Sequence, residues 1–373
     1  MRGPDPLKAA FRFHPDVELV VFDRLDAERQ ARLAHLARDP AFYGVLVTPS
    51  TSKAVDRDSA LLLLTLRTPG PIPQYALRAL GPDARRRILG WVLDGVLEME
   101  HEGVFHSGPA AASLVARDLD AEGVIGRLSI EALRYAAALE TRDPSMIAGR
   151  LYRYNRIPLS PRYARVHATE TDEDRLGLAT PRAASILARC WTRTSASGTP
   201  WISWIARRDG DRPVSGGGTY KLYVSPAAVA VRHVFPDVVA AVTPHRPFAC
   251  KVGKGPHGLL RPDKMVIYFA RRDDLYEAAG AVARALAGAP AHGVPFSSAI
   301  AADGLVSWGV DPPDDEGVMR VMRSESWRER LTNQMGAAFV AAPRRSEGVE
   351  AVVRFVLLRL EAHGIDPTTW APV

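Results

Sequence analysis

Lysine is scarce in this chain, and four of its lysines lie close together. Of the 48 basic residues only six are lysine, and a window of 44 residues holds Lys221, Lys251, Lys254 and Lys264. An arginine side chain stays protonated, whereas an ammonium group can lose its proton when burial or neighbouring cations lower its pKa. A group of lysines in a chain that otherwise uses arginine therefore indicates acid–base chemistry, with solvated surface lysines as the alternative.

Two of these lysines fall on predicted strands. The sequence pattern predicts strands at residues 219–224 (TYKLYV), 248–252 (FACKV) and 265–270 (MVIYFA). Lys221 and Tyr223 stand two residues apart on the first strand, so their side chains point to the same side. Lys251 stands at the end of the second strand. If the three strands are neighbours, these polar side chains converge on one pocket.

The connection between the second and third strands is basic. Its sequence, KGPHGLLRPDK, contains Lys254, His257, Arg261 and Lys264. Arginine presents a fork of N–H donors that matches phosphate oxygens, and a lysine crowded by cations favours its neutral form, which is a base. We therefore predict a phosphate pocket with a base beside it. The alternative is a surface loop whose charges pair with Asp263 and Asp273.

Most other signatures of catalysis are missing from the sequence. It contains no GxGxxG after a predicted strand and no GxxxxGK[ST], HExxH, CxxC, EF-hand or GxSxG pattern. Cys190 and Cys250 are too few for a disulfide framework or a metal cage. We expect no metal or cofactor, no membrane span and a reduced, cytoplasmic protein. The net charge of +6 fits a phosphate-bearing partner, whereas nucleic acid is not the expected partner.

The order of the predicted elements indicates an α+β fold with two domains. Residues 68–108 predict helix, turn, helix and hairpin, the layout of a winged helix, with a local packing unit as the alternative. Beyond residue 218 strands alternate with helices, which is typical of a catalytic domain. We expect a helical, winged-helix-like N-terminal region (1–145) packed on a mixed α/β catalytic domain (146–373) with its core at 201–340.

Helices and strands outside these motifs are also predicted. Asp26 is the expected N-cap of a helix that ends at Ala37. The other helices are expected at 128–139, 181–193, 226–235, 273–287, 324–340 and 348–363, and two further strands at 42–48 and 305–310.

Several segments resemble the Hop-A type III effector family, whose bacterial relatives act as lyases in class V lanthipeptide and thioamitide biosynthesis. The likeness lies in GGGTYKLYVSP, CKVGKGPHGLLRPDKMVIYF, GLVSWG and SESWRER, and upstream in VLDGVLEMEHEGVFHSG and RLYRYNRIPLSP. Its most specific motif is K-x-Y followed by K-V…R-x-D-K-x-V-x-Y-F. The resemblance covers about residues 85–340 and implies that the C-terminal domain is lyase-like.

The resemblance implies a metal-free β-elimination. In the related phosphothreonine lyases a lysine takes the α-proton, an acid protonates the leaving phosphate, and Arg and Lys groups hold that phosphate. If these roles are transferred to the matching positions of this chain, Lys251 would be the base, and Lys221 would neutralise the phosphate or the developing enolate. The remaining phosphate ligands would be Arg261, Lys264, Lys254, Arg328 and Arg323.

The acid departs from the family pattern. The lyases have a histidine two residues after the strand lysine, where this chain has Tyr223, so His257 is the other candidate. An aromatic and basic segment adds Tyr152, Tyr154 and Arg156, which would line a substrate channel. A packed aromatic corner between domains is the alternative for these three residues.

The implied reaction gives dehydroalanine or dehydrobutyrine from phosphoserine or phosphothreonine in a ribosomal precursor peptide. The expected partners are that phosphorylated peptide and a cognate Ser/Thr kinase, which could form a stable complex with the chain. Residues 68–108 could bind the peptide leader or the kinase by strand addition. Two other functions stay open. The chain could be a non-catalytic basic binding protein, with a winged-helix module that binds nucleic acid or scaffolds a kinase. It could also be an effector-like phosphothreonine lyase that acts on proteins.

Overall fold

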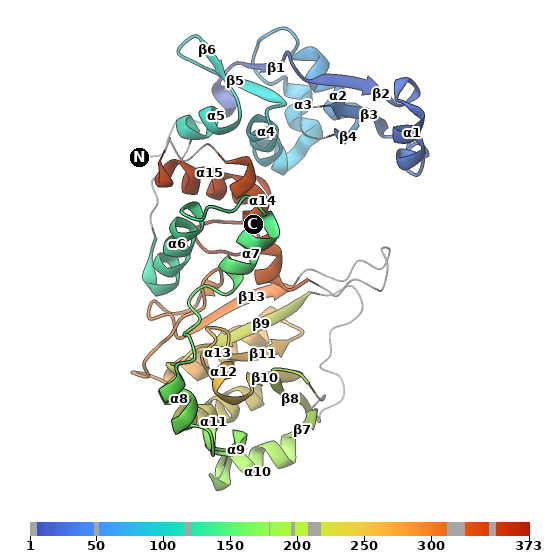
Figure 1. The fold of residues 1–373 in the computed structure, drawn as a ribbon. Helices are drawn as coiled ribbons and strands as arrows, with labels where there is room; N and C mark the ends of the chain where they lie inside the picture. Colours follow the sequence, from blue (N-terminus) through green and yellow to red (C-terminus); the bar gives the residue numbers. More distant parts are fainter. Residues whose placement is uncertain are drawn as a thin grey trace. The chain divides into compact units, whose positions relative to one another are not determined.

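The computed structural model describes residues 6–47, 52–115, 121–178, 180–194, 198–207, 218–311, 325–342 and 348–373. The fold is α+β, and the chain divides into two compact units (Figure 1). One comprises Met1–Leu119 and Ala342–Ile365, and the other comprises Asp120–Ala341 and Asp366–Val373. No helix among the described residues has the length and apolar run needed to span a bilayer.

The predicted division at residue 145 falls inside the second unit. Helix α6 (Gly123–Ala137) contacts α7 (Pro144–Tyr152), which packs along α14 (Trp327–Ala341). The last helix, α15 (Val349–Ala362), packs on helices α4 and α5 of the first unit. Helices near the middle and the end of the chain thus belong with partners distant in sequence, which the order of elements cannot reveal.

The first unit contains the predicted helix, helix and hairpin of residues 68–108. Helices α3 (Gln74–Leu80) and α4 (Ala84–Leu93) precede the hairpin of β5 (Leu97–His101) and β6 (Val104–His106), and β1 (Phe11–Phe13) pairs with β5. The unit also contains β2 (Glu18–Val21), β3 (Phe42–Val47), β4 (Ser52–Asp56), α1 (Ala27–Leu33), α2 (Arg57–Thr65) and α5 (Gly108–Val115). As predicted, Asp26 caps α1, because its side chain accepts a hydrogen bond from the backbone N–H of Arg29 at 2.8 Å.

The second unit is built on an antiparallel sheet of seven strands in the order β12-β13-β9-β11-β10-β8-β7. The strands are β7 (Trp191–Thr194), β8 (Trp201–Ala206), β9 (Thr219–Val224), β10 (Ala249–Gly253), β11 (Met265–Phe269), β12 (Ser298–Ala299) and β13 (Val306–Asp311). The three strands predicted to carry the lysine motifs are therefore neighbours, in the order β9-β11-β10. This confirms the condition on which the predicted pocket depended.

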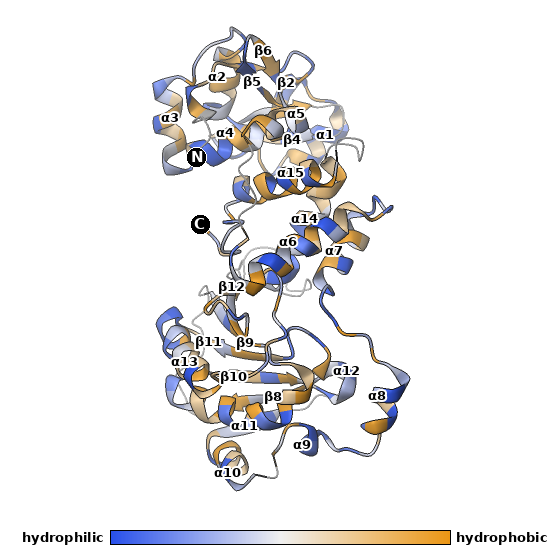
Figure 2. Cartoon of the chain, turned by 90° about the vertical axis from the view of Figure 1, so that its left-hand side faces the viewer, coloured by the Kyte–Doolittle hydropathy of each residue, from blue (hydrophilic) through white to orange (hydrophobic). Residues whose placement is uncertain are grey.

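Helices cover one face of this sheet. They are α10 (Pro181–Cys190), α11 (Val231–Val242) and α13 (Arg272–Ala285). Figure 2 shows hydrophilic and hydrophobic residues on α13. Their apolar residues form the main core with strand residues such as Leu222, Ile267 and Cys250. These three residues lie opposite one another in the register, so they share one face of the sheet.

Strand alternation places the lysines on the other face. Lys221 pairs across the sheet with Tyr268, while Tyr223 pairs with Val266, which in turn pairs with Lys251. Residues directly opposite in an antiparallel pair point to the same side, so all five share one face. The core therefore fixes the register that brings two lysines from different strands together.

Several predicted elements differ from the structure. The helix predicted at 181–193 ends at Cys190, and the chain continues as strand β7 from Trp191. The basic connection, predicted as a loop, contains a short helix, α12 (Gly255–Leu259), with Pro256 in its first turn. The helix predicted at 226–235 starts later, because Pro226 forms a bridge to Ala291, and α11 begins at Val231. The remaining short helices are α8 (Pro161–Val166) and α9 (Asp172–Arg175).

Candidate functional site

Two lysines flank the ring of Tyr268. The Nζ atoms of Lys221 and Lys251 lie 5.5 and 5.4 Å from its centroid, and Lys251 Nζ also lies 4.5 Å from the ring of Trp201. These distances are those of cation–π contacts. Strand β10 supplies Lys251, β9 supplies Lys221, and the aromatic rings come from the strands on either side of β10, which lie beside it in the register.

The pKa of Lys251 is lowered from 10.5 to about 8. Burial is the largest cause, since it disfavours the charged ammonium, and the positive charge of Lys221 is the second. At pH 7 about a tenth of Lys251 side chains is therefore neutral. A neutral amine on a half-buried lysine is able to accept a proton from a weak carbon acid.

Lys221 is held by a carboxylate. Its Nζ pairs with Asp311 Oδ2, and the other oxygen of Asp311 accepts a hydrogen bond from the backbone N–H of Trp327 at 2.8 Å. That N–H belongs to the first turn of α14, where an acidic side chain is favourable. Asp311 thus ties the strand lysine to the start of the helix that carries Arg328.

A second carboxylate joins two arginines. Asp263 accepts two hydrogen bonds from Arg261, at 2.9 and 3.0 Å, and one from Arg328 at 3.2 Å. Burial would raise the pKa of Asp263, but the positive charges of Arg328 and Arg261 outweigh it and lower the pKa to about 2. The Asp263 pairing expected for a plain surface loop is thus present, but it lies in the interior.

Arg328 is the most firmly held of these cations. Its guanidinium also donates to the backbone carbonyls of Pro295 and Tyr152, both at 3.1 Å, and lies 4.8 Å from the Tyr152 ring. The side chain is almost wholly buried. Arg261 is more open and stacks on Trp201, with its Cζ atom 4.6 Å from the ring centroid.

The assembled cluster has a positive surplus. Lys221, Lys251, Arg261 and Arg328 provide four cationic groups when Lys251 is protonated, and only two carboxylates, on Asp263 and Asp311, pair with them in the described residues. The difference is two positive charges when Lys251 is protonated and one when Lys251 is neutral. Such a site favours an anion with about two negative charges, which is the charge of a phosphate monoester near neutral pH.

Lys264 has its hydrogen-bond partner outside this cluster, although the charge of Asp263 also acts on it. It is fully buried, and its Nζ lies 2.8 Å from Nδ1 of His292, which sequence reasoning did not single out. Burial lowers the pKa of Lys264 to about 7. The pKa of His292 is lowered to about 4, mainly by burial and secondly by the positive charge of Lys264. His292 is therefore the acceptor in this pair, and Lys264 has its partner already.

The two groups considered as the acid have different environments. Tyr223 is 4% exposed, its pKa is raised well above 10 by burial, and its ring lies beside Gly309 next to Trp327. His257 is exposed on α12. Exposure makes His257 accessible to a substrate, while the high pKa of Tyr223 makes it a weak proton donor.

The other predicted residues are spread around the cluster. Lys254 is exposed just before α12, and Arg156 donates to the carbonyl of His257 at 3.4 Å. Tyr152 lies against Arg328, whereas the Tyr154 ring packs on Tyr135 with centroids 5.6 Å apart. Arg323, the remaining predicted phosphate ligand, lies outside the described residues.

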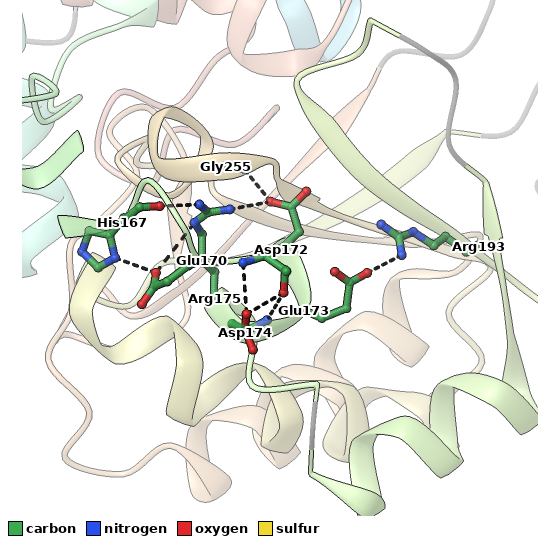
Figure 3. A network of polar contacts seen from close by, with 9 residues as sticks. His167, Glu170, Asp172, Glu173, Asp174, Arg175, Arg193 and Gly255 are labelled. Carbon is green, nitrogen blue, oxygen red and sulfur yellow. Dashed lines mark hydrogen bonds and ion pairs between the residues drawn. The ribbon is translucent and has the colours of Figure 1, made fainter. Parts of the chain in front are cut away.

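A polar network attaches the α8–α9 segment to the basic connection (Figure 3). Asp172 accepts a hydrogen bond from the N–H of Gly255 at 3.0 Å and pairs with Arg175 at 3.2 Å. Arg175 also donates to the carbonyl of His167, whose ring bonds Glu170 at 2.6 Å. The network fixes the start of α12, and with it the backbone that leads to Arg261.

Sequence reasoning missed the aromatic and acidic parts of the site. Trp201 and Tyr268 stand on strands and look like ordinary core residues, and Asp311 follows the GLVSWG segment without a distinctive neighbour. Only strand register brings them to the lysines. Among the described residues, no group of three or more His, Cys, Asp or Glu side chains could hold a metal ion.

Comparison with known proteins gives distant structural neighbours only. No family model and no curated protein matches the chain. An effector protein from Pseudomonas syringae pv. tomato strain DC3000 is 14% identical to this chain, with a TM-score of 0.39. The match covers 66% of this chain and 96% of the effector chain. One from Pseudomonas syringae pv. syringae strain 61 is 10% identical, with a TM-score of 0.38 and coverage of 68% and 99%. The type III effector and phosphothreonine lyase OspF from Shigella flexneri is 12% identical, with a TM-score of 0.29 and coverage of 39% and 86%.

Proposed function

We propose that this chain is a lyase that eliminates phosphate from phosphoserine or phosphothreonine. The observation that carries the proposal is the lowered pKa of Lys251 in a cluster with surplus positive charge. A base and an anion site side by side are the two requirements of this reaction. The sequence motifs K-x-Y and K-V…R-x-D-K-x-V-x-Y-F, which resemble the lyases, support the same function.

The proposed reaction begins with neutral Lys251. Its Nζ takes the α-proton of the phosphorylated residue, and the electron pair of that C–H bond forms the Cα–Cβ double bond. The Cβ–O bond breaks, and its electrons leave with the phosphate. The products are a dehydroalanine or dehydrobutyrine residue, inorganic phosphate and a protonated Lys251, which returns its proton to solvent.

Electrostatic stabilisation falls to the other cations. Lys221 lies beside Lys251 on the shared ring of Tyr268, so its charge is placed to offset the negative charge that develops on the substrate carbonyl or phosphate. Arg261 uses Nε and Nη2 on Asp263, so its remaining N–H donors are the ones that would reach a phosphate. The buried Arg328 holds Asp263 and Tyr152 in place. Tyr223 is buried with a raised pKa and is a weak donor, so the leaving phosphate takes up its proton from solvent, and His257 stays the accessible alternative donor.

The proposed substrate is a ribosomal precursor peptide that a separate Ser/Thr kinase has phosphorylated. The resemblance to lanthipeptide and thioamitide lyases supports this choice of substrate and partner. The hairpin of β5 and β6 in the first unit leaves β6 as the edge of its described sheet, so an extended leader peptide could add a strand there. The reaction would proceed without a metal or redox cofactor, since elimination needs only a base and a stabilised leaving group.

A phosphopeptide assay tests the proposal. The full chain is mixed with a phosphoserine peptide, with and without the candidate kinase, and released phosphate and product mass are followed. We expect a mass loss of phosphoric acid with wild type and with Lys8→Ala, an exposed lysine of the first unit, and none with Lys251→Ala. Hydrolysis to serine would make the chain a phosphatase. If no peptide reacts with the partner present, a non-catalytic binding protein is the better description.

A further inference from the structure

A run of arginines lies between the last turn of α7 and the end of α8. The segment 150–165, RLYRYNRIPLSPRYAR, contains five arginines and no acidic residue. All five are exposed, and no carboxylate of the described residues is ion-paired with any of them. Arg153 lies back along α7 beside Gly149, whereas Arg156, Arg162 and Arg165 follow this helix in the chain. These last three residues are called the arginine strip below.

The chain that carries the strip is attached to both ends of α12. The backbone N–H of Ile157 donates to the carbonyl of Leu260 at 3.0 Å. After α8, Asp172 accepts a hydrogen bond from the N–H of Gly255 at 3.0 Å, as Figure 3 shows. Gly255 is the first residue of α12, and Leu260 follows its last. Because α12 leads into Arg261, the strip is fastened to the backbone that positions this arginine of the cluster.

The path from the strip to the cluster is short. Arg156 donates from Nη2 to the carbonyl of His257, which stands four residues before Arg261. Four residues of helical backbone rise about 6 Å, and two residues of extended peptide span the same distance. The residues between, 254–262, include no acidic residue, and Lys254 and His257 are exposed among them. The positive charge therefore continues from the strip to the cluster.

The acidic residues that follow the strip are engaged elsewhere. Glu170 lies 3.8 Å from Arg175, and Glu173 pairs with Arg193 of β7 at 2.7 Å. Asp174 completes the capping box of α9. Since these carboxylates have their own partners, the guanidinium groups of the strip remain available to carboxylates of another molecule.

The remaining side chains of this segment fit a peptide better than a nucleic acid. Ile157 and Val166 are 42% and 64% exposed, so apolar contact is offered next to the charges. The rings of Tyr154 and Tyr163 pack on other rings of the chain, whereas proteins that bind single-stranded nucleic acid offer such rings to the bases.

We propose that the arginine strip binds acidic residues that flank the phosphorylated residue of the substrate peptide. This inference rests on the proposed lyase function and specifies its substrate as an acidic phosphopeptide. With the phosphorylated residue at Arg261, carboxylates from about the second residue onward on one side would reach Arg156 and then α8. Arg162 and Arg165 stand three residues apart and share a face of α8, so a single peptide can contact both.

Binding of matched phosphopeptides tests the inference. Fluorescein-labelled peptides carry one phosphoserine and three glutamates within the next six residues, on one side or on the other, and the reference peptide has glutamine at these positions. The Kd is measured by anisotropy at one salt concentration with Lys251→Ala, so that no substrate is consumed. An exposed ion pair contributes about threefold in affinity, so we expect the glutamate peptide of one side to bind about tenfold more tightly than the reference.

Two double variants separate the strip from net charge. Arg162→Gln with Arg165→Gln, made in the Lys251→Ala protein, should remove most of the gain from glutamate. Arg182→Gln with Arg189→Gln removes two exposed arginines from α10 in the same unit and should keep the gain. Circular dichroism of both variants checks that the fold is unchanged.

Several results would overturn the inference. They are equal Kd values for the glutamate and glutamine peptides, an equal loss in the α10 control, and an equal gain from glutamates on both sides. Tighter binding of a short single-stranded RNA through Arg162 and Arg165 would make the strip a nucleic-acid surface instead.

The test is separate from that of the lyase. If wild type eliminates phosphate from both peptides with the same kcat/KM and glutamate brings no gain in binding, the lyase function stands and the strip assignment fails. If nothing is eliminated while the gain that depends on Arg162 and Arg165 persists, the lyase function fails and the strip is a surface for acidic phosphopeptides.

Discussion

Lys251 should make elimination depend on pH with an inflection near pH 8. A base must be neutral to act, and a lysine with its ordinary pKa of 10.5 is about 0.03% neutral at pH 7. A pKa of about 8 raises the neutral fraction to about 9%, a gain of about 300-fold. The rate should therefore rise about eightfold from pH 6.5 to 7.5 and level off above pH 9.

Removing the neighbouring charge should move this inflection. Lys221 lowers the pKa of Lys251, so Lys221→Met should raise that pKa and shift the profile to higher pH. Burial is the larger cause and persists in the variant, so the inflection should stay below 10.5. The kcat of the variant should recover in part at high pH.

The assay is single-turnover release of phosphate from saturating phosphopeptide between pH 6.5 and 10. This range lies above the second pKa of a phosphate monoester, about 6, so ionisation of the substrate contributes little. Lys251→Arg, which cannot provide a neutral amine, should be inactive throughout. A flat profile in wild type, or the same inflection in Lys221→Met, would refute the assignment of Lys251 as a base tuned by its neighbour.

Three further predictions concern the groups around the lysines. Asp263→Asn should lower the free energy of unfolding, measured by chemical denaturation, by about 3 kcal/mol, because it leaves the buried Arg328 and the half-buried Arg261 without their carboxylate. The control Asp273→Asn, at an exposed position, should change this free energy by less than about 1 kcal/mol. Trp201→Leu should expose Lys251 to water and raise its pKa, so activity should fall at pH 7 and recover by pH 10; an equal loss at both would assign Trp201 another role. Burial of the protonated Lys264 amine lowers the stability of the folded protein, and Lys264→Met should remove this loss. The folded-state pKa of Lys264 lies near 7, below its unfolded value, so the wild type should gain stability relative to the variant as pH rises from 7 to 10, and parallel curves would contradict this.

Many elements of both units could be predicted from local pattern. The strands at TYKLYV and MVIYF and the helices near 273–287 and 348–363 appear within a few residues of their predicted bounds, because apolar periodicity is a local property. The pairing of Lys221 and Tyr223 on one side of a strand is likewise set by local geometry. The helices and hairpin of residues 68–108 also follow from local signals.

The composition of the sequence alone marked the lysines and the basic connection, but it could not decide which charges meet. Lys264 and Arg261 stand three residues apart in one motif, yet one is buried against His292 and the other lies on the ring of Trp201. Asp311 and Arg328 come to the cluster from segments far along the chain. Sheet register and helix packing are set by the burial of many apolar groups at once, and that sum over distant contacts, rather than any local pattern, determines the neighbours of each charged side chain.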